Sequence, residues 1–442
     1  MPHLTKYTDV EIWATSMRSN ADAWKRLETL CSVKPFPQLP VPRQFPWLYL
    51  KRIAEFAFDF ENKLPSRFGI WKNVYCKNAS IQIKFLRIIG QLLYRLKIHR
   101  ILARFVENEQ RRRRLAPDIV VSFRAFDPDI VLIMNPFFNS ENPIGCYALE
   151  NGVRTVALIP SWDNITTKPK MLVRYDSYAV WSQEQMTQLN KVYGVPEKQI
   201  GIIGTPQYDV FFDDTYYQER GEFFAKIGLD PKKKLVVYAL GSPNFIQEHH
   251  GIISFCEHIT SKDLEYFQIL IRPHPVHNTK DLTNFLLPVS EKIILRHSPN
   301  DSLDKQARIQ DDDDIRIWVN TMRHADVLIN LVSTVAIDAA FFDKPIVNLT
   351  YDPEPNATHD VLVKEINEQW SHFAPISKIG GIANVSSPRE AVSAVRSYLN
   401  EPMRDSLGRQ RMLDFVCQYT DGKCGERFST YILTLLPEIN CN

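Results

Sequence analysis

Short apolar runs alternate with helix-like segments through most of the chain. Runs rich in Val, Ile and Leu and ended by turn residues predict strands. They lie at 118–123, 129–136, 154–162, 177–182, 199–206, 235–243, 267–275, 291–297, 326–333 and 344–350. Continuous apolar strands separated by helices are typical of parallel sheets covered on both faces. The pattern therefore predicts an α/β fold with two Rossmann-like, doubly wound domains facing a cleft. Helical patterns at 389–399, 403–419 and 424–435 predict terminal helices that cross back over the linker.

Before this alternating region, the pattern predicts a strand at 10–15, a helix at 20–30 capped by Asn20, and a proline-rich loop at 34–46. A basic amphipathic helix is predicted at about 84–114. Its apolar positions are Phe85, Ile88, Ile89, Leu92, Leu93, Leu96, Ile101, Leu102 and Phe105. Two interpretations stay open: the helix packs its apolar face on the core, or its basic face docks on anionic lipid head groups.

A polar stretch at 213–234 places the domain boundary near residue 225. Residues 1–225 are then an N-terminal acceptor-binding domain, and 226–442 are a C-terminal donor-binding domain with the terminal helices. The acidic run Asp311–Asp314 is predicted to be a solvated loop. The alternative, a metal site of the Asp-x-Asp type, lacks the expected strand and turn around it.

Composition argues against a nucleic-acid-binding protein, a zinc protein and a membrane-spanning protein. The 442 residues carry a net charge of +2, which gives no general attraction to nucleic acid. None of the seven cysteines forms a C-x-x-C pair, so we expect reduced thiols in a cytoplasmic protein without a zinc site. The first residues contain no long apolar run, and no segment reaches the ~20 apolar residues of a membrane span. Any membrane contact is expected at the inner surface of the cytoplasmic membrane, as a peripheral protein.

Three candidate phosphate contacts follow predicted strands of the second half, and in open parallel sheets ligands bind at such ends. Gly241 and Ser242 come first, since glycine lets backbone amides approach a phosphate and serine donates a hydrogen bond. Many ordinary turns carry the same pair. Next, "RPHP" places Arg272 and His274 between two prolines, which stiffen the loop. The alternative is a turn with a surface arginine.

In the third feature, a strand ends at Ser333 and Thr334, and a helix begins directly after them. A helix N-terminus with Ser or Thr is a ready phosphate site, although it can also be an ordinary N-cap. Asp338 lies one turn further along, where a carboxylate could accept hydrogen bonds from ribose hydroxyls. Together, the three features indicate a nucleotide-linked donor.

These motifs resemble a known group. "RPHP" followed by "ADVLIN-x-x-STVAIDAA-x-x-x-KPIV" is similar to the donor half of bacterial surface-polysaccharide glycosyltransferases of the GT-B fold, related to the CDP-glycerol glycerophosphotransferases. The resemblance implies that His274-Pro275 and Ser333-Thr334 contact the donor phosphates. The acidic residue after the Ser/Thr pair is usually Glu in that group, and here it is Asp338. "SWDNITTK" at 161–168 also resembles such transferases, and the likeness covers about residues 115–435.

Transfer to an acceptor hydroxyl needs a general base in the first domain. Asp163, in the Trp-Asp-Asn turn after a strand, is one candidate, and Glu141 is a second. Their alternatives are an Asx turn and an exposed loop carboxylate. His274 is expected to help the nucleotide to leave. No metal is expected, because Arg272, His274 and the helix at Ser333 could neutralise the leaving phosphate.

The sequence therefore predicts a nucleotide-sugar-dependent glycosyltransferase of surface polysaccharide, lipopolysaccharide, O-antigen or capsule synthesis. It needs no cofactor beyond the nucleotide-activated donor, and its acceptor is a glycan or is lipid-linked. An anionic membrane surface is a further partner, and nucleic acid is not. Inversion is implied by the resemblance. The alternatives are a CDP-glycerol-type glycerophosphotransferase, a UDP-sugar 2-epimerase, which would need no acceptor, and a binding protein without catalysis.

Overall fold

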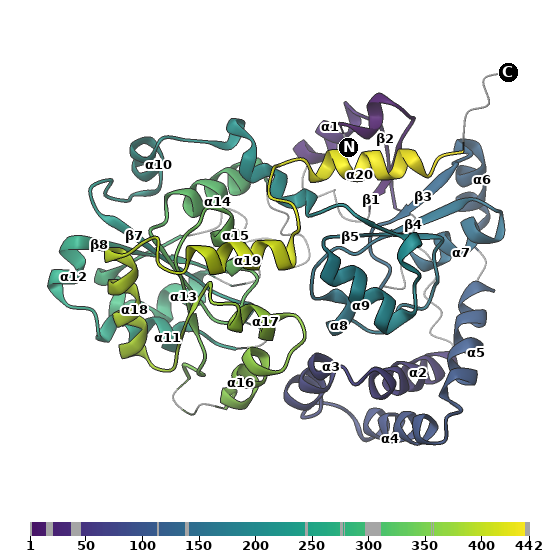
Figure 1. Cartoon of the computed structure of the whole chain (residues 1–442), viewed down its shortest axis with the longest axis horizontal. Coiled ribbons are helices and arrows are strands. Elements are labelled where there is room, and N and C mark those ends of the chain that lie inside the picture. Colours follow the sequence, from purple (N-terminus) through teal and green to yellow (C-terminus); the bar gives the residue numbers. More distant parts are fainter. Residues whose placement is uncertain are drawn as a thin grey trace.

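The computed structural model describes residues 2–14, 21–36, 46–112, 115–137, 141–243, 246–274, 277, 279–296, 311–354, 356 and 358–437. Within these residues the chain forms two lobes, each built around a parallel sheet flanked by helices (Figure 1). The predicted α/β class with two parallel-sheet lobes is confirmed. Asn20, most of the proline-rich stretch and Pro275 lie outside the described residues.

The second lobe holds a six-stranded parallel sheet in the order β12-β11-β10-β7-β8-β9. Its strands are β7 (Lys234–Ala239), β8 (Phe267–Arg272), β9 (Ile293–Leu295), β10 (Val327–Asn330), β11 (Ile346–Leu349) and β12 (Ala383–Val385). The chain builds outward from β7 in one direction and then, from β10, in the other. The strand order therefore reverses beside β7, which is where open α/β sheets bind ligands.

Alternation along β7 shows why this sheet is covered on both faces. Leu235 and Val237 pack with one group of helices, and Val236 and Tyr238 pack with another. The first group comprises α10 (Arg220–Ile227), α14 (Asp312–His324), α15 (Val335–Phe341), α16 (Asp360–Glu368), α17 (Phe373–Lys378) and α19 (Ser406–Val416). The second comprises α11 (His249–Glu257), α13 (Thr279–Phe285) and α18 (Pro388–Asn400), and α12 (Ser261–Tyr266) precedes β8. The predicted boundary near residue 225 falls within α10, which lies on the second lobe (Figure 1).

The first lobe holds a four-stranded parallel sheet in the order β3-β4-β5-β6. Its strands are β3 (Ile130–Ile133), β4 (Arg154–Leu158), β5 (Ser177–Val180) and β6 (Ile200–Ile202). The main helices beside it are α6 (Pro117–Phe126), α7 (Asn142–Glu150), α8 (Asn164–Thr167) and α9 (Gln183–Tyr193). The C-terminal helix α20 (Cys424–Thr434) crosses back, and its Ile432 packs on Val156 of β4 (Figure 1). A separate parallel pair, β1 (Glu11–Ala14) and β2 (Ser32–Pro35), lies near α1 (Ala21–Glu28).

A helical layer, α2 (Trp47–Asn62), α3 (Pro65–Ile70), α4 (Ile81–Arg95) and α5 (His99–Arg111), adjoins the first lobe (Figure 1). The single helix predicted at 84–114 is wrong, because the chain breaks at Lys97, whose φ is +58°, and turns into α5. The core interpretation also fails for most of its apolar positions. Leu86 is buried against α2, whereas Phe85, Ile88, Leu92, Leu96, Ile101 and Phe105 are exposed.

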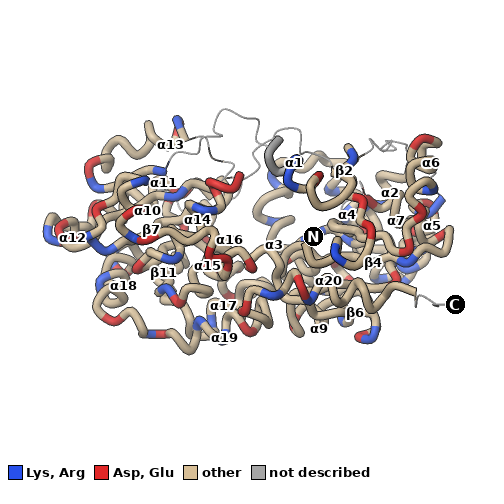
Figure 2. Tube along the Cα trace, turned by 90° about the horizontal axis from the view of Figure 1, so that it is seen from above, with Lys and Arg blue, Asp and Glu red and all other residues tan. Residues whose placement is uncertain are grey.

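Two further predictions are corrected. Residues 118–123 are not a strand but part of α6, in which Pro117 stands at the first turn and Ile119 and Phe123 are buried four residues apart. A short Val- and Ile-rich run fits either state, and here only one helical face is covered. The acidic run is not a loop either. Asp311 caps α14 by accepting from the Asp314 amide at 2.8 Å, and the carboxylates suit the positive end of the helix dipole. Asp312 also pairs with Arg26 of α1. Acidic and basic residues are spread over both lobes (Figure 2).

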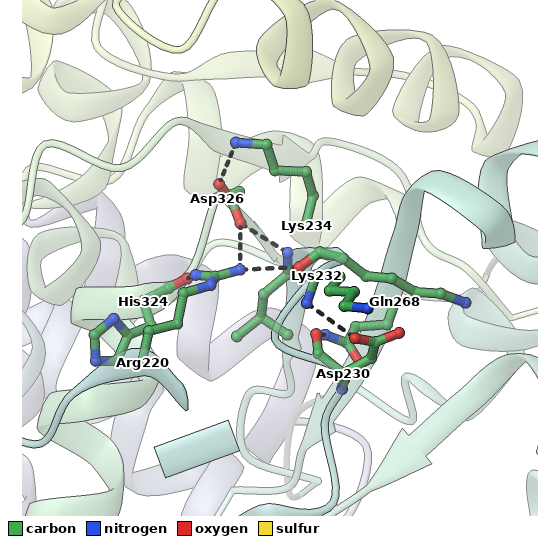
Figure 3. Close-up of polar contacts among 9 residues, drawn as sticks. Arg220, Asp230, Lys232, Lys234, Gln268, His324 and Asp326 are labelled. Carbon is green, nitrogen blue, oxygen red and sulfur yellow. Dashed lines mark hydrogen bonds and ion pairs between the residues drawn. The ribbon is translucent and has the colours of Figure 1, made fainter. Parts of the chain in front are cut away.

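The edge of the second sheet where its strands begin carries a polar network that is satisfied within the protein (Figure 3). Arg220 donates to the carbonyl oxygens of His324 at 2.7 Å and Lys233 at 2.9 Å, and to Asp326 at 3.3 Å. Asp326 also accepts from Lys234 Nζ at 3.1 Å and from the Leu235 amide at 2.8 Å. This network fastens α10 and α14 to the start of the sheet.

Candidate nucleotide-transfer site

The strand register brings the three predicted donor features to neighbouring positions. Ala239 at the end of β7 lies opposite Arg272 of β8 on one side and opposite Asn330 of β10 on the other. Gly241, Arg272 and the turn leading to Ser333 therefore follow three adjacent strand ends, beside the strand-order reversal. This arrangement comes from the sheet topology, since about 90 residues of chain separate the first feature from the last.

Arg272 is held by an aromatic ring rather than by a carboxylate. Its guanidinium lies 3.7 Å from the centre of the Trp318 ring, and the ring nitrogen of Trp318 donates to Asp338 Oδ2 at 2.9 Å. Within the described residues, Arg272 forms no ion pair, and its nearest hydrogen-bond acceptor is the Pro273 carbonyl at 3.5 Å. Burial lowers the pKa of Arg272 to about 10, so it keeps its charge at neutral pH. A partly buried cation stacked in this way favours an anionic ligand.

Asp338 lies on α15 and faces inward. Burial raises its pKa to about 6, while hydrogen bonds from Tyr208 and Trp318 and the charge of Arg272 act in the opposite direction. Tyr208 belongs to η5 (Pro206–Phe212), a 3-10 helix between the lobes. The carboxylate is thus engaged by two side chains of the protein. The predicted ribose contact of Asp338 stays a prediction, and it would have to compete with these bonds.

His274 follows Arg272 at the same strand end. Its backbone amide donates to Nδ1 of His277 at 3.1 Å. Burial, together with the charges of His277 and Arg272, lowers the pKa of His274 to about 4. The imidazole is therefore neutral at pH 7 before an anion binds, so it enters the reaction as a neutral hydrogen-bonding group.

The backbone amide of Gly241 already donates a hydrogen bond within the protein. It donates to Glu248 Oε1 at 2.6 Å, and a Cβ added at Gly241 would come within 2.9 Å of that same oxygen. Burial raises the pKa of Glu248 to about 8. The close approach that requires glycine here is therefore to Glu248, and a phosphate contact by Gly241 would require Glu248 to release the amide. Ser242 is the next residue along this turn.

Ser333 and Thr334 stand at the beginning of α15 as predicted. Val332 before them adopts a positive φ of +40°, which turns the chain sharply out of β10. Ser333 Oγ accepts from the Val335 amide at 3.4 Å, whereas the Thr334 side chain makes no capping hydrogen bond. The two hydroxyls lie beside the strand end that neighbours β7.

Asp163, the first candidate base, immediately precedes α8 after β4. Its carboxylate accepts from Ser161 Oγ at 2.5 Å, from Asn164 Nδ2 at 3.1 Å and from Thr167 Oγ1 at 2.7 Å. The second lobe approaches it through His372, the residue before α17. The His372 ring lies 5.3 Å from that of Trp162. Asp163 therefore lies at the interface of the lobes, held by three short side chains.

Sequence reasoning missed His372. Burial lowers its pKa to about 4, and the charge of Asp163 opposes that shift. Its Nδ1 is buried without a hydrogen-bond partner among the described residues. Trp318 was missed as well, because its helix begins in the acidic run, for which the sequence predicts a loop. No local pattern marks either residue, since both act through contacts with distant segments.

Glu141, the second candidate base, has a local role. Its Oε2 accepts from the backbone amides of Met134 at 2.7 Å and Asn135 at 3.0 Å, which fixes the turn after β3. Burial raises its pKa. Its carboxylate therefore closes a turn of the first lobe.

Within the described part of the chain, one group of residues has spacing that would suit a metal ion, namely Asp352, Glu354 and His359. The carboxylate of Asp352 accepts from the backbone amides of Glu354 at 3.0 Å and His359 at 2.6 Å. These bonds account for the cluster as a closed turn after β11. In the same described ranges, no helix combines the length and apolar character needed to cross a bilayer.

Comparison with known proteins shows which family this chain belongs to. The model of the CDP-Glycerol:Poly(glycerophosphate) glycerophosphotransferase family matches residues 160–434, which is more than half of the 442 residues. The chain belongs to this family. The family match runs from the segment containing Asp163 to the end of α20, so it includes all three predicted donor features. The protein is accordingly an enzyme, a nucleotide-dependent transferase of cell-surface polymer synthesis.

Solved structures with low sequence identity are also similar. An S. aureus MnaA–UDP co-structure has 14% identity and a TM-score of 0.48, covering 75% of this chain and 82% of that one. The UDP-GlcNAc 2-epimerase from Neisseria meningitidis bound to UDP-GlcNAc has 11% identity and a TM-score of 0.47, covering 75% and 82%. The wall teichoic acid polymerase TagF has 15% identity and a TM-score of 0.40, covering 59% and 58%. No curated protein matches the sequence.

Proposed function

We propose that this enzyme transfers a glycerophosphate-type group from a CDP-linked donor to a hydroxyl of a lipid-linked or oligosaccharide acceptor. The observation that carries the proposal is Arg272, a partly buried guanidinium at a strand end, stacked on Trp318 and without an ion-pair partner in the described residues. Such a group suits a diphosphate, because it offers a planar fork of donors in a low-dielectric site. The family match supports the donor class.

In this reaction, the acceptor oxygen attacks the phosphorus that carries the glycerol. The bond from that phosphorus to the oxygen bridging the two phosphates breaks, and CMP leaves. The acceptor proton goes to Asp163, and Arg272 stabilises the charge that grows on the leaving phosphate. His274 and the hydroxyls of Ser333 and Thr334 add hydrogen bonds to the donor phosphates. No step requires a metal ion.

Asp163 is favoured over Glu141 as the general base because it lies at the interface with the second lobe. Asp163 faces the second lobe, as its interaction with His372 indicates, whereas Glu141 is bound to two backbone amides of its own lobe. Three hydrogen bonds fix the Asp163 carboxylate, and oxygen lone pairs remain to accept a proton.

Glycosyl transfer from a nucleotide sugar is the second candidate, because the same phosphate contacts suit a sugar donor. The acceptor oxygen would then attack the anomeric carbon with inversion, and the bond from that carbon to the phosphate oxygen would break. The released nucleotide separates the two reactions, since CDP-glycerol yields CMP, whereas a nucleoside diphosphate sugar yields the nucleoside diphosphate. A 2-epimerase would convert its substrate with no acceptor present.

A peripheral membrane contact completes the proposal. The docking surface consists of the exposed apolar side chains of α4 and α5 and of the turn between them: Ile81, Phe85, Ile88, Leu92, Leu96, Ile98, Ile101 and Phe105. Residues 62–106 contain ten Lys or Arg and no Asp or Glu. An apolar stripe in a segment this rich in cations fits an anionic bilayer surface, where the acceptor lipid would reside. A protein partner is the other occupant, and vesicle binding separates the two.

The donor class is tested by thermal shift against CMP, CDP, UMP, UDP, GDP, dTDP and CDP-glycerol. We expect stabilisation by the cytidine nucleotides and little by the others, because binding to the folded state alone raises the melting temperature. His274→Ala should unfold at an unchanged temperature without ligand and should lose transfer activity. Stabilisation by a different base alone would overturn the CDP assignment, and near-normal turnover in the variant would remove His274 from the site.

The base assignment is tested with the donor so identified. We expect Asp163→Asn to lower kcat about 10²- to 10⁴-fold at an unchanged donor affinity, since proton transfer by a placed side chain contributes that much. Glu141→Gln is the matched control and should lower stability with kcat nearly intact. If Glu141→Gln is the variant that loses kcat, the two roles are exchanged.

A further inference from the structure

A cavity of about 680 Å³ lies in the first lobe, away from the transfer site. It is bounded by α2, α5, the segment after α8, and α9. Its apolar lining includes Phe58, Met171, Val173, Tyr178, Tyr193 and Val195. Asp163 does not line it. The volume falls in the range of about 300–1,000 Å³ that is typical of small-molecule sites.

Five cations from three segments surround this cavity: Arg100, Arg104, Lys170, Arg174 and Lys191. Only two carboxylates join them, and both are already paired. Glu61 accepts from Arg100 at 2.8 Å, and its other oxygen lies 3.2 Å from His99 Nε2. Glu107 pairs with Lys170.

Three of the cations have no ion-pair partner in the part of the chain that the structure describes. Arg104, Arg174 and Lys191 form no ion pair among the described residues. Cations gathered around one cavity repel each other, so an anion bound there would remove an unfavourable interaction as well as form new ones. The buried His99 also lines the cavity, and its Nδ1 has no hydrogen-bond partner within the described part of the chain.

The position of α5 relates the cavity to the docking surface. Arg100 and Arg104 line the cavity, while Ile101 and Phe105, the next residues around the same helix, are 71% and 48% exposed. Successive residues of a helix point about 100° apart, so one helix separates the cavity from the apolar stripe. A bilayer against that stripe would place its head groups at the level of the cavity rim.

We propose that this cavity binds the phosphate-bearing head group of the membrane-anchored acceptor. The arginine forks bind the phosphate oxygens, and the aromatic lining packs against the attached glycerol or sugar. This inference rests on the proposed function for the identity of the acceptor. What it adds is a second phosphate site: the first lobe recognises the phosphate of the acceptor, and the second lobe binds the phosphates of the donor.

The test uses the full chain, without nucleotide, and vesicles of phosphatidylcholine carrying either phosphatidic acid or phosphatidylserine at equal surface charge. We expect at least tenfold tighter binding to the phosphatidic acid vesicles, because an exposed phosphomonoester can enter the cavity. The triple variant Arg104→Gln, Arg174→Gln, Lys191→Gln should bind the two kinds of vesicle equally. All three side chains are exposed, so the fold should tolerate the change, and unchanged thermal unfolding confirms this.

The matched control is Arg95→Gln, which removes a cation beside the docking surface but outside the cavity. It should weaken binding to both vesicles and keep the preference. Soluble glycerol 3-phosphate should compete with phosphatidic acid vesicles for the wild-type protein, which separates phosphate recognition from lipid packing. Equal binding of wild type to both vesicles, or a preference retained by the triple variant, overturns the proposal. Neither result depends on nucleotide binding, so failure of this inference would leave the proposed donor untested rather than refuted.

Discussion

The charged side chains at the two edges of the second sheet differ in whether other groups of the protein satisfy them. Where the strands begin, Arg220 and Asp326 are satisfied by each other and by neighbouring backbone groups (Figure 3). Where the strands end, Arg272 is partly buried against the Trp318 indole and forms no ion pair with any described residue. A satisfied network holds the fold together, while a partly buried cation without an ion-pair partner costs stability until an anion binds. This difference favours the edge where the strands end as the proposed functional edge.

The largest effect is expected from Arg272→Ala, which tests whether this arginine serves ligand binding rather than the fold. Cytidine nucleotide affinity should fall roughly 30- to 100-fold, because a hydrogen-bonded charge contributes about 2–3 kcal/mol. Stability without ligand should change little, since losing the contact with Trp318 is offset by removing a partly buried charge that has no ion-pair partner among the described residues. Isothermal titration and thermal unfolding measure the two effects. Arg272→Lys should recover only part of the affinity, because an ammonium lacks the fork. A large loss of stability with normal affinity would assign Arg272 to the fold.

Arg220→Ala should show the reverse pattern. The variant loses hydrogen bonds to His324, Lys233 and Asp326, which should lower the free energy of unfolding by about 1.5–3 kcal/mol. Nucleotide affinity should stay within about twofold of the wild type, since this network lies at the opposite edge of the sheet. Lys232→Ala is the control, because this exposed side chain lies in the same region and should change stability by less than about 0.5 kcal/mol. Weakened binding in Arg220→Ala would remove the distinction between the edges.

The smallest expected effect is a proton taken up on binding. The pKa of His274 is lowered to about 4 by burial and by the neighbouring His277 and Arg272, and a bound diphosphate should raise it. At pH 6, binding should therefore take up a fraction of a proton, so the heat of binding should depend on the ionisation enthalpy of the buffer. His274→Asn should lose most of this dependence, and identical heats in all buffers would contradict it.

The same lowered pKa affects stability in the ligand-free protein. Between about pH 4 and 6.5 the unfolded chain binds more protons at His274 than the folded chain does, so this residue makes stability rise with pH. Asp338 acts in the opposite direction from its ordinary value up to about pH 6, because its raised pKa means that the folded protein holds the proton more tightly. Comparing His274→Asn and Asp338→Asn across this range separates the two contributions.

Local sequence patterns predicted the strands of the second lobe well. Buried parallel strands read as continuous apolar runs, and β7, β8, β10 and β11 were placed from that signal alone. The same signal misplaced 118–123, because a short apolar run does not reveal whether one face or two will be covered. The predicted helix at 84–114 failed at Lys97, where a positive φ turns the chain and no Gly or Pro marks the break.

The sequence by itself determined the α/β class, the order of the strands along the chain and the residues at their ends, because local periodicity and turn residues carry that information. Only the tertiary structure decided which of those residues meet. It placed Trp318 under Arg272, bound Gly241 to Glu248, brought His372 to Asp163 and left the apolar stripe of α4 exposed. Each of these depends on contacts between segments distant in the chain, and burial and charge at such contacts are properties of the packed molecule.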